Sequence, residues 1–165
     1  MPDRDELLQE FDEEMAVTRR VLERVPDDRP DWKPHPRSFS IAHLAQLVAW
    51  MPGWQVHTLK QGKLDLATAG KYSNERTSTL LALFDKNVQE GRAAIAEATA
   101  ADFDAPWSLV MGDKTLFSSS KGRVVRQNLN HLVHHRAQLG VYLRLLDVPV
   151  PGMYGPTADE RGFMG

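Results

Sequence analysis

Residues 130–146, NHLVHHRAQLGVYLRLL, carry the pattern that decides the fold. At about 100° of rotation per residue, His131 and His135 lie about 40° apart on one face of an α-helix. His134 lies about 100° from His135, near the edge of that face. A helix is therefore predicted over residues 122–146, with both outer histidines turned inward. The apolar residues on or beside the same face are Val124, Leu139, Tyr142 and Leu146.

Three further segments have apolar residues spaced by threes and fours, which predicts amphipathic helices. One covers residues 3–25, and another covers residues 74–98. The remaining helix begins after Ser40, whose hydroxyl can cap it, and is kinked or ended at Pro52, because proline lacks a backbone donor.

The connections between these helices are long. Residues 26–39 contain four prolines, which predicts an extended segment. A polar loop is expected over residues 60–71, and a short β-hairpin over residues 107–117, where two apolar runs flank Gly112-Asp113. The predicted fold class is all-α: a four-helix bundle with long connections, forming a single domain over residues 1–165.

Composition excludes several classes of function. The chain has 165 residues, 42% of them hydrophobic and 25% charged, and a formal net charge of -2. This balance favours a globular protein and gives no reason to expect nucleic acid or a membrane as a partner. No basic and apolar leader or long apolar run is present, so a cytoplasmic location is expected. The absence of cysteine means that nitrogen or oxygen atoms must hold any metal ion.

The histidines are the candidate ligands of such an ion. His131 and His135 can present their ring nitrogens to one metal, but a pair leaves the ion underligated. His43 shares a helical stripe with apolar residues and is the best third donor, whereas His57, 14 residues later, lies about 21 Å further along a continuous helix. The alternative is that these are core histidines satisfied by hydrogen bonds.

Two polar residues lie close to the histidine stripe. Gln138 and Tyr142 can hydrogen-bond an imidazole or a metal-bound water, which would orient the ligands. Arg136, about 140° from His131, can pair with an acidic residue of a neighbouring helix or reach a dimer surface. The sequence nominates no catalytic residue, because no Asp or Glu lies on the His131 stripe to serve as a general base.

Two stretches resemble the DinB/YfiT-like superfamily of damage-inducible helical proteins. Residues 31–50, DWKPHPRSFSIAHLAQLVAW, are similar to its tryptophan-proline entry into the second helix and its histidine. Residues 130–160, NHLVHHRAQLGVYLRLLDVPVPGMYGPTADE, are similar to its H-x-x-x-H-R-G-Q motif and the tail that follows. Ala137 and Asp147 stand where the family has glycine, which bears on local geometry rather than on the ligands.

The resemblance implies a bundle that is commonly dimeric and holds a divalent metal on three histidines with open positions for water. Carried onto this sequence, the ligands are His43, His131 and His135. Zinc or nickel suits imidazole donors best, with manganese or iron as further candidates. Relatives in the superfamily include thiol transferases and isomerases that use a low-molecular-weight thiol.

The leading hypothesis is accordingly a metal-dependent enzyme in which the ion activates a thiol or water nucleophile against a small-molecule substrate, as in thiol transferases, isomerases or hydrolases. The alternative is a non-catalytic stress-response bundle that the metal stabilises and that binds a partner. A third reading is a plain helical bundle whose histidines satisfy each other through water. A solvent-connected cavity beside the ligands distinguishes the first reading from the second.

Overall fold

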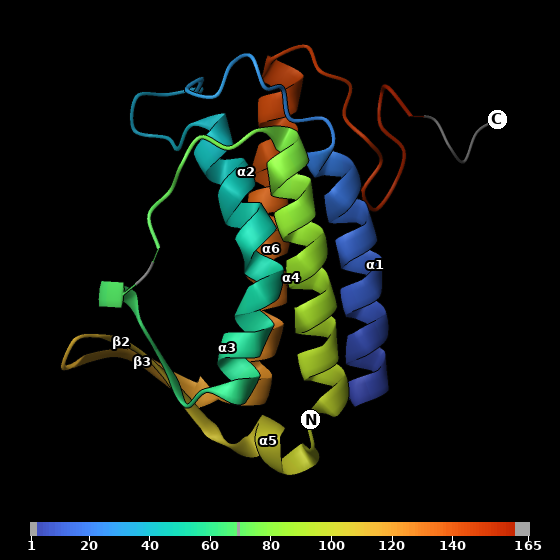
Figure 1. Ribbon diagram of the computed structural model, residues 1–165. Coiled ribbons are helices and arrows are strands. Elements are labelled where there is room, and N and C mark those ends of the chain that lie inside the picture. Colours follow the sequence, from blue (N-terminus) through green and yellow to red (C-terminus); the bar gives the residue numbers. More distant parts are fainter. Residues whose placement is uncertain (1–2, 69, 161–165) are drawn as a thin grey trace.

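The computed structural model describes residues 3–68 and 70–160, so the ends of the predicted domain, residues 1–2 and 161–165, and residue 69 of the predicted loop lie outside the described residues. Long helices run side by side, and a small sheet lies at one side of them (Figure 1). The helices are α1 (Arg4–Leu22), α2 (Ile41–Trp50), α3 (Trp54–Lys60), α4 (Thr77–Glu97), α5 (Ala100–Asp104) and α6 (Lys121–Leu145).

The helices begin where the sequence offers caps. The Asp3 carboxylate accepts a hydrogen bond from the backbone N–H of Asp5, and the Ser40 hydroxyl accepts one from the N–H of His43. Both groups satisfy donors that the first turn of a helix leaves free. The helical segments predicted from the spacing of apolar residues are therefore present, each shorter or shifted by a few residues at its ends.

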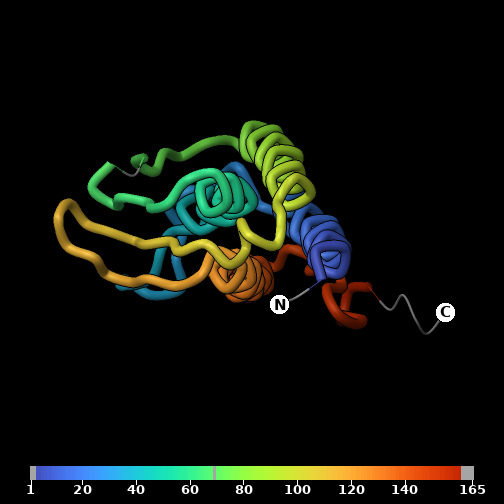
Figure 2. Tube along the Cα trace, turned by 90° about the horizontal axis from the view of Figure 1, so that it is seen from below, coloured from blue at the N-terminus to red at the C-terminus, as the bar shows by residue number. Residues whose placement is uncertain are grey.

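Pro52 divides the second predicted helix. The 3₁₀ turn η1 (Met51–Gly53) separates α2 from α3, which continue one after the other along α4 and α6. Seen from below, the stack of α2 and α3, together with α1, α4 and α6, surrounds a common interior (Figure 2). The buried apolar side chains of these helices form one core, which includes Leu7, Phe11, Leu44, Val48, Phe84, Ile95, Leu129, Leu132 and Leu139.

The sheet is the main departure from the all-α prediction. Strand β1 (Lys63–Asp65) pairs in parallel with β2 (Pro106–Met111), and β2 pairs antiparallel with β3 (Lys114–Ser120). The predicted hairpin is present, and Gly112 at its turn has a φ of 56°, which favours glycine. The predicted polar loop over residues 60–71 was wrong in part, because it contains β1 and the 3₁₀ turn η2 (Leu66–Thr68).

The structure is thus mostly helical with a small three-stranded mixed sheet, and a simple four-helix bundle does not describe it fully. Three residues, none of them fully buried, carry too little hydrophobic pattern to reveal β1, whose pairing with β2 spans more than 40 positions of the chain. Helix α5 was also missed. It is a single short turn with a capping box between Thr99 and Asp102.

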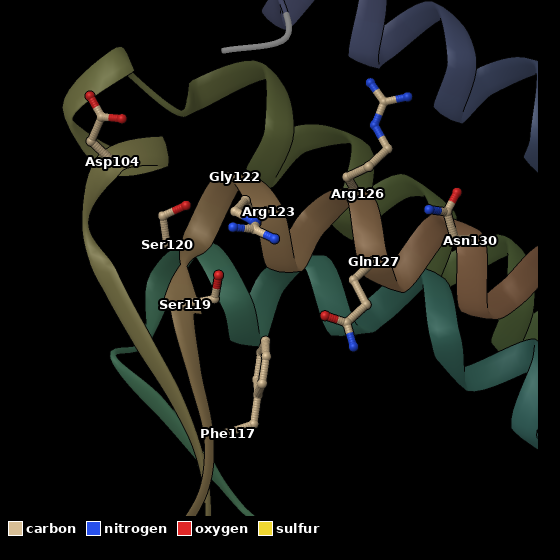
Figure 3. A pocket seen from close by; sticks show the side chains of 9 residues that line it. All are labelled: Asp104, Phe117, Ser119, Ser120, Gly122, Arg123, Arg126, Gln127 and Asn130. Atoms are coloured by element: carbon tan, nitrogen blue, oxygen red, sulfur yellow. The ribbon is translucent and has the colours of Figure 1, made fainter.

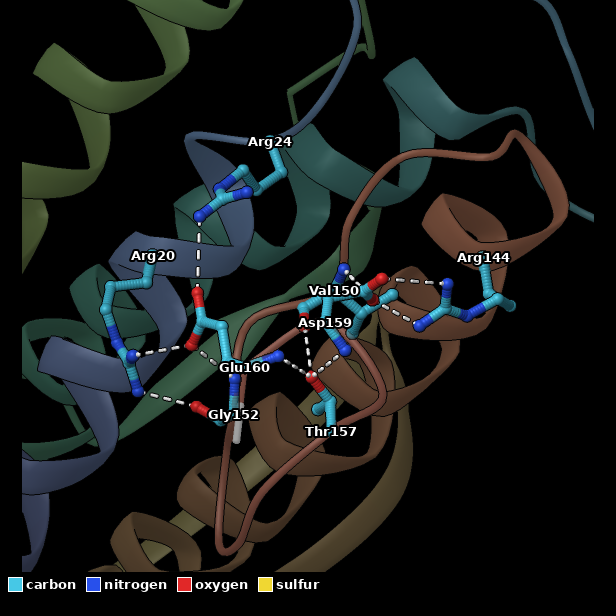
Figure 4. Close-up of polar contacts among 8 residues, drawn as sticks. All are labelled: Arg20, Arg24, Arg144, Val150, Gly152, Thr157, Asp159 and Glu160. Carbon is cyan, nitrogen blue, oxygen red and sulfur yellow. Dashed lines mark hydrogen bonds and ion pairs between the residues drawn. The ribbon is translucent and has the colours of Figure 1, made fainter. Parts of the chain in front are cut away.

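After α6 the chain returns along the outside of the helices. Asp159 pairs with Arg144 of α6, and Glu160 pairs with Arg20 of α1 and with Arg24, two residues after α1 ends (Figure 4). The Thr157 hydroxyl donates to the Val150 carbonyl at 2.8 Å and closes the segment on itself. No helix within residues 3–68 and 70–160 has the length and apolar character needed to span a membrane.

Candidate metal centre and adjoining cavity

His131 and His135 meet one turn apart on α6. Their Nε2 atoms lie 2.9 Å apart, and the ring centroids lie 4.7 Å apart. Two zinc–nitrogen bonds of about 2.0–2.1 Å in tetrahedral geometry place their nitrogens about 3.3 Å apart. The two nitrogens are therefore within a few tenths of an ångström of the separation that a shared ion requires, and without an ion one of them donates a hydrogen bond to the other.

Gln138 orients the His135 ring. Its Oε1 lies 2.8 Å from Nδ1 of His135. An amide oxygen only accepts, so Nδ1 carries the proton and Nε2 keeps its lone pair toward His131. Residues that hydrogen-bond the non-coordinating nitrogen of a histidine ligand fix its ring in the same way. Gln138 thus hydrogen-bonds an imidazole, as expected from the sequence.

The two histidines differ in exposure. His135 is buried, with 8% of its surface accessible, whereas His131 is exposed at the edge of α3 and the sheet. The prediction that both rings point into the interior was therefore wrong for His131, which lies at the surface with its ring beside Trp54 and the adjoining cavity. Desolvation lowers the pKa of both rings, and the charge of His135 lowers that of His131 further. Both are thus favoured in the neutral form that metal binding needs.

His43 does not join this pair in the structure. Its ring is stacked between those of Phe39 and Tyr72, with centroid distances of 4.2 Å and 3.6 Å. Burial lowers the pKa of His43, so this ring too is favoured as neutral imidazole. Across residues 3–68 and 70–160, no three His, Asp or Glu side chains stand close enough to hold a metal ion together.

The residues therefore fit a metal in part. His131 and His135 form a preorganised pair, and the third position of the predicted ligand set is not filled by His43 as its side chain lies here. The Tyr142 hydroxyl donates to the Phe39 carbonyl at 3.2 Å, which ties α6 to the segment before α2 rather than to a ligand. Phe39 and Tyr72 were not expected near His43, since neither lies on its helical stripe.

A cavity of about 260 Å³ adjoins His131. It lies between α3, the first half of α6 and the sheet, so its walls come from segments far apart in the sequence. Trp54 is one wall, with its ring 5.7 Å from that of His131. The residues that line it are Trp54, His57, Thr58, Leu64, Leu66, Trp107, Leu109, Phe117, Val124, Gln127, Asn128 and His131.

His57, which was set aside as too far from His43 to share an ion, thus lies in the wall of the cavity next to His131. The hairpin that supplies Trp107, Leu109 and Phe117 was expected from the sequence, but its packing beside α3 and α6 depends on tertiary contacts that no local pattern indicates.

A larger and more polar cavity of about 750 Å³ lies on the neighbouring face of α6 (Figure 3). Arg123 and Arg126 are among the side chains that line it, and no histidine is. It shares Phe117 and Gln127 with the smaller cavity. Size alone would favour this cavity as a site, but the neutral imidazole pair adjoins the smaller one, which makes that one the better candidate.

These features define a mostly helical protein with a close histidine pair beside a small, largely apolar cavity that His131 lines. The chain belongs to the DinB family, whose model matches residues 1–161. None of the curated proteins matches it.

Solved structures share the fold. A DinB-like protein from Bacillus subtilis is 18% identical, with a TM-score of 0.71 over 90% of this chain and 97% of that one. A DinB-like protein from Bacillus cereus ATCC 10987 is also 18% identical, with a TM-score of 0.70 over 90% of this chain and 95% of that one. A mycothiol-dependent maleylpyruvate isomerase is 13% identical, with a TM-score of 0.59 over 84% of this chain and 61% of that one.

Proposed function

We propose that this protein is a metal-dependent enzyme of the DinB/YfiT-like type, in which a divalent ion on His43, His131 and His135 activates a thiol or water nucleophile against a small-molecule substrate. The observation that carries the proposal is the 2.9 Å approach of two neutral imidazole nitrogens beside a cavity. Zinc or nickel is the preferred ion, and manganese and iron are the other candidates.

Each residue has a defined part in this proposal. His131 and His135 bind the ion, and Gln138 holds the His135 ring in the tautomer that leaves Nε2 free. His43 completes the set only after its ring leaves the stack between Phe39 and Tyr72. When bound, the ion would lower the pKa of a thiol or water and polarise a carbonyl group.

A thiol co-substrate is supported by the structural neighbour described as mycothiol-dependent. Among the described residues no carboxylate lines the cavity, so beside the proposed ligand His131 the imidazole of His57 is the group in its wall that can accept a proton. A thiol has a pKa far closer to neutrality than water and needs less help to ionise. We therefore favour thiol transfer or isomerisation over hydrolysis.

The test of the metal site is elemental analysis of untagged protein after loading with zinc or nickel. We expect about one ion per chain, lost in His135→Ala and His131→Ala. His134→Ala is the matched control, since His134 is an exposed neighbour on the same helix, and it should retain the ion. Loss of the ion in His43→Ala would identify the third ligand. Wild-type protein that binds no divalent ion would refute the proposal.

The test of catalysis is the metal-dependent reaction of a chromogenic electrophile, 1-chloro-2,4-dinitrobenzene, with a panel of low-molecular-weight thiols. Loaded wild-type protein should accelerate the reaction with at least one thiol, and His135→Ala should not. Stoichiometric metal without acceleration of any thiol would favour the alternative, a metal-stabilised stress-response protein that binds a partner.

A homodimer is part of the proposal. Val141 and Leu145 lie one turn apart on α6 with 59% and 55% of their surfaces exposed, so they form a small apolar patch on one face of the helix. A second copy would cover them. Light scattering should give twice the chain mass for the wild type and the chain mass for Val141→Glu with Leu145→Glu. A monomeric wild type would contradict the proposed dimer but not the proposed metal site or catalysis.

A further inference from the structure

The cavity beside His131 has two chemically different sides. Toward the sheet its wall is apolar and aromatic, with two tryptophans, Phe117 and three leucines, and α3 adds the polar side chains of His57 and Thr58 beside Trp54. On the side of α6, Gln127, Asn128 and His131 follow one another within about one helical turn. A molecule in the cavity therefore meets an apolar surface at one end and hydrogen-bonding groups at the other.

The histidine pair lies at the polar side. His131, Asn128 and Val124 recur at spacings of three and four on α6, so they form one face of the helix, and His135 continues that face by one turn. The polar side of the cavity thus leads directly to the proposed metal position. A ligand held by its apolar part would present its other end to that position.

The wall contains no fixed charge. Among the described residues, no Asp, Glu, Lys or Arg lines the cavity, and its ionisable groups are the imidazoles of His57 and His131. An anion buried there would lose its hydration without gaining a cationic partner such as arginine or lysine. The neighbouring larger cavity, by contrast, has Arg123 and Arg126 in its wall (Figure 3). The smaller cavity therefore selects against charge in the part of the ligand it encloses.

The volume of the cavity also limits the size of the group that it can enclose. A cavity of about 150 Å³ lined by apolar side chains is large enough to hold benzene. The cavity here is about 260 Å³, which has room for a substituted ring or a branched aliphatic group of similar volume.

We propose that this cavity is the specificity pocket of the protein and binds the uncharged, ring-sized apolar body of the substrate, whose polar end faces His131 and Asn128. The inference rests on the proposed function for its link to catalysis. The binding of an uncharged apolar group is, however, a property of the cavity walls and does not require a metal.

The test compares two probes with the same ring, benzyl alcohol and benzoate, binding to the full chain. The indole N–H signals of the four tryptophans in a ¹H–¹⁵N spectrum report the site. Trp54 and Trp107 line the cavity, whereas Trp32 and Trp50 do not. Benzyl alcohol should shift the first two signals and leave the others in place, and it should bind about tenfold or more tightly than benzoate, since only benzoate carries an uncompensated charge.

Two leucines of the hairpin, each replaced by tryptophan, give a matched pair of variants. Leu109→Trp fills the cavity and should weaken benzyl alcohol binding about tenfold or more, since it removes the volume that the ring occupies. Leu116→Trp lies outside the cavity on an exposed position of β3 and should bind like the wild type. The probe comparison uses wild-type protein, so the proposal stays testable even if Leu109→Trp fails to fold.

Benzyl alcohol is titrated into metal-loaded protein and into protein treated with a chelator. The two titrations separate this inference from the proposed function. Benzyl alcohol binding without any metal uptake would support the pocket while the metal-dependent enzyme fails. Metal uptake without benzyl alcohol binding, or benzoate binding to the chelator-treated protein as tightly as benzyl alcohol, would overturn the pocket while the proposed function stands.

Discussion

Nη1 of Arg136 lies 2.6 Å from Oε2 of Glu14, and this ion pair joins α6 to α1 in the interior. Arg136 is only 1% exposed. The same nitrogen donates at 3.1 Å to the Glu14 carbonyl and at 3.1 Å to the Thr18 hydroxyl. Tyr154 covers the guanidinium with its ring, 5.3 Å away, and donates its hydroxyl to Oε1 of Glu14. Of the two pairings expected for Arg136, the acidic residue on a neighbouring helix is the one the structure has.

Replacement of Arg136 by methionine should strongly destabilise the fold. Methionine keeps much of the volume but leaves the partly buried Glu14 carboxylate without its cation, and breaking one side of such a pair costs about 3 kcal/mol or more. Chemical denaturation should show this loss in the free energy of unfolding.

The double variant with Glu14→Met is the control. Removal of both charges leaves no uncompensated group, so the double variant should be more stable than Arg136→Met alone. Equal stability of the two variants would mean that the loss comes from packing and not from the ion pair.

Gln138 should tune metal affinity without being a ligand. In Gln138→Leu the His135 ring loses the acceptor at Nδ1, so we expect zinc affinity to fall by about 10- to 100-fold, as for other residues that orient ligands. Competition with a chromogenic chelator measures this. Gln138→Glu keeps an acceptor oxygen and should recover most of the affinity.

Gln89→Leu is the matched control for that prediction, because Gln89 is an exposed glutamine of α4, away from α6. Its zinc affinity should equal that of the wild type. A Gln138→Leu variant that binds zinc as tightly as Gln89→Leu would exclude the orienting role.

Replacement of Gly91 by alanine should not stabilise α4, although alanine usually stabilises a helix relative to glycine. A Cβ atom at Gly91 would lie 2.3 Å from the Pro52 carbonyl oxygen, so α4 must move away from η1 to accept it. Alanine normally stabilises a helix by about 1 kcal/mol relative to glycine. Here we expect Gly91→Ala to destabilise by about 1–3 kcal/mol instead, because the obstacle is backbone.

Gly140 supplies the control in α6. A Cβ atom there would lie 2.7 Å from the terminal methyl of Met153, which is flexible and can turn aside. Gly140→Ala should therefore stay within about 1 kcal/mol of the wild type in the same denaturation experiment. A Gly91→Ala variant as stable as Gly140→Ala would contradict the close approach of α4 and η1.

The segment after α6 should loosen in acid. A hydrogen bond from Arg144 and one from the Val150 N–H lower the pKa of Asp159. The stability that the Asp159 carboxylate contributes is therefore present above about pH 4, which is the pKa of an aspartate in the unfolded chain. This contribution is lost as pH falls through the lower pKa of Asp159 in the folded protein. The melting temperature of Asp159→Asn should lie below that of the wild type at pH 7, and the difference should vanish toward pH 2.

Asp28→Asn is the comparison for this effect. Asp28 is exposed, and its carboxylate lies 3.7 Å from the neighbouring Arg29, which is too far for a hydrogen bond. Its melting temperature should follow that of the wild type at every pH. A difference between Asp159→Asn and the wild type that persists unchanged in acid would refute the role of the Asp159 charge (Figure 4).

The helices and their caps could be read from the sequence because each is a local pattern. Ser40 caps α2 as expected, and Pro52 interrupts the helix that it begins, because a cap and a missing backbone donor act within one turn. Strand β1 could not be read in this way. Its three residues gain their structure from pairing with β2, and pairing between distant segments leaves little trace in a short stretch of sequence.

The sequence by itself determined that His131 and His135 lie together, because residues four apart on a helix share a face whatever surrounds them. Only the tertiary structure decided which walls stand beside them and where His43 lies. The cavity exists because a sheet formed from distant segments packs near α3 and α6, and His43 is held between Phe39 and Tyr72, which belong to separate connections. Such positions depend on how loops fold back over helices, which no local periodicity encodes.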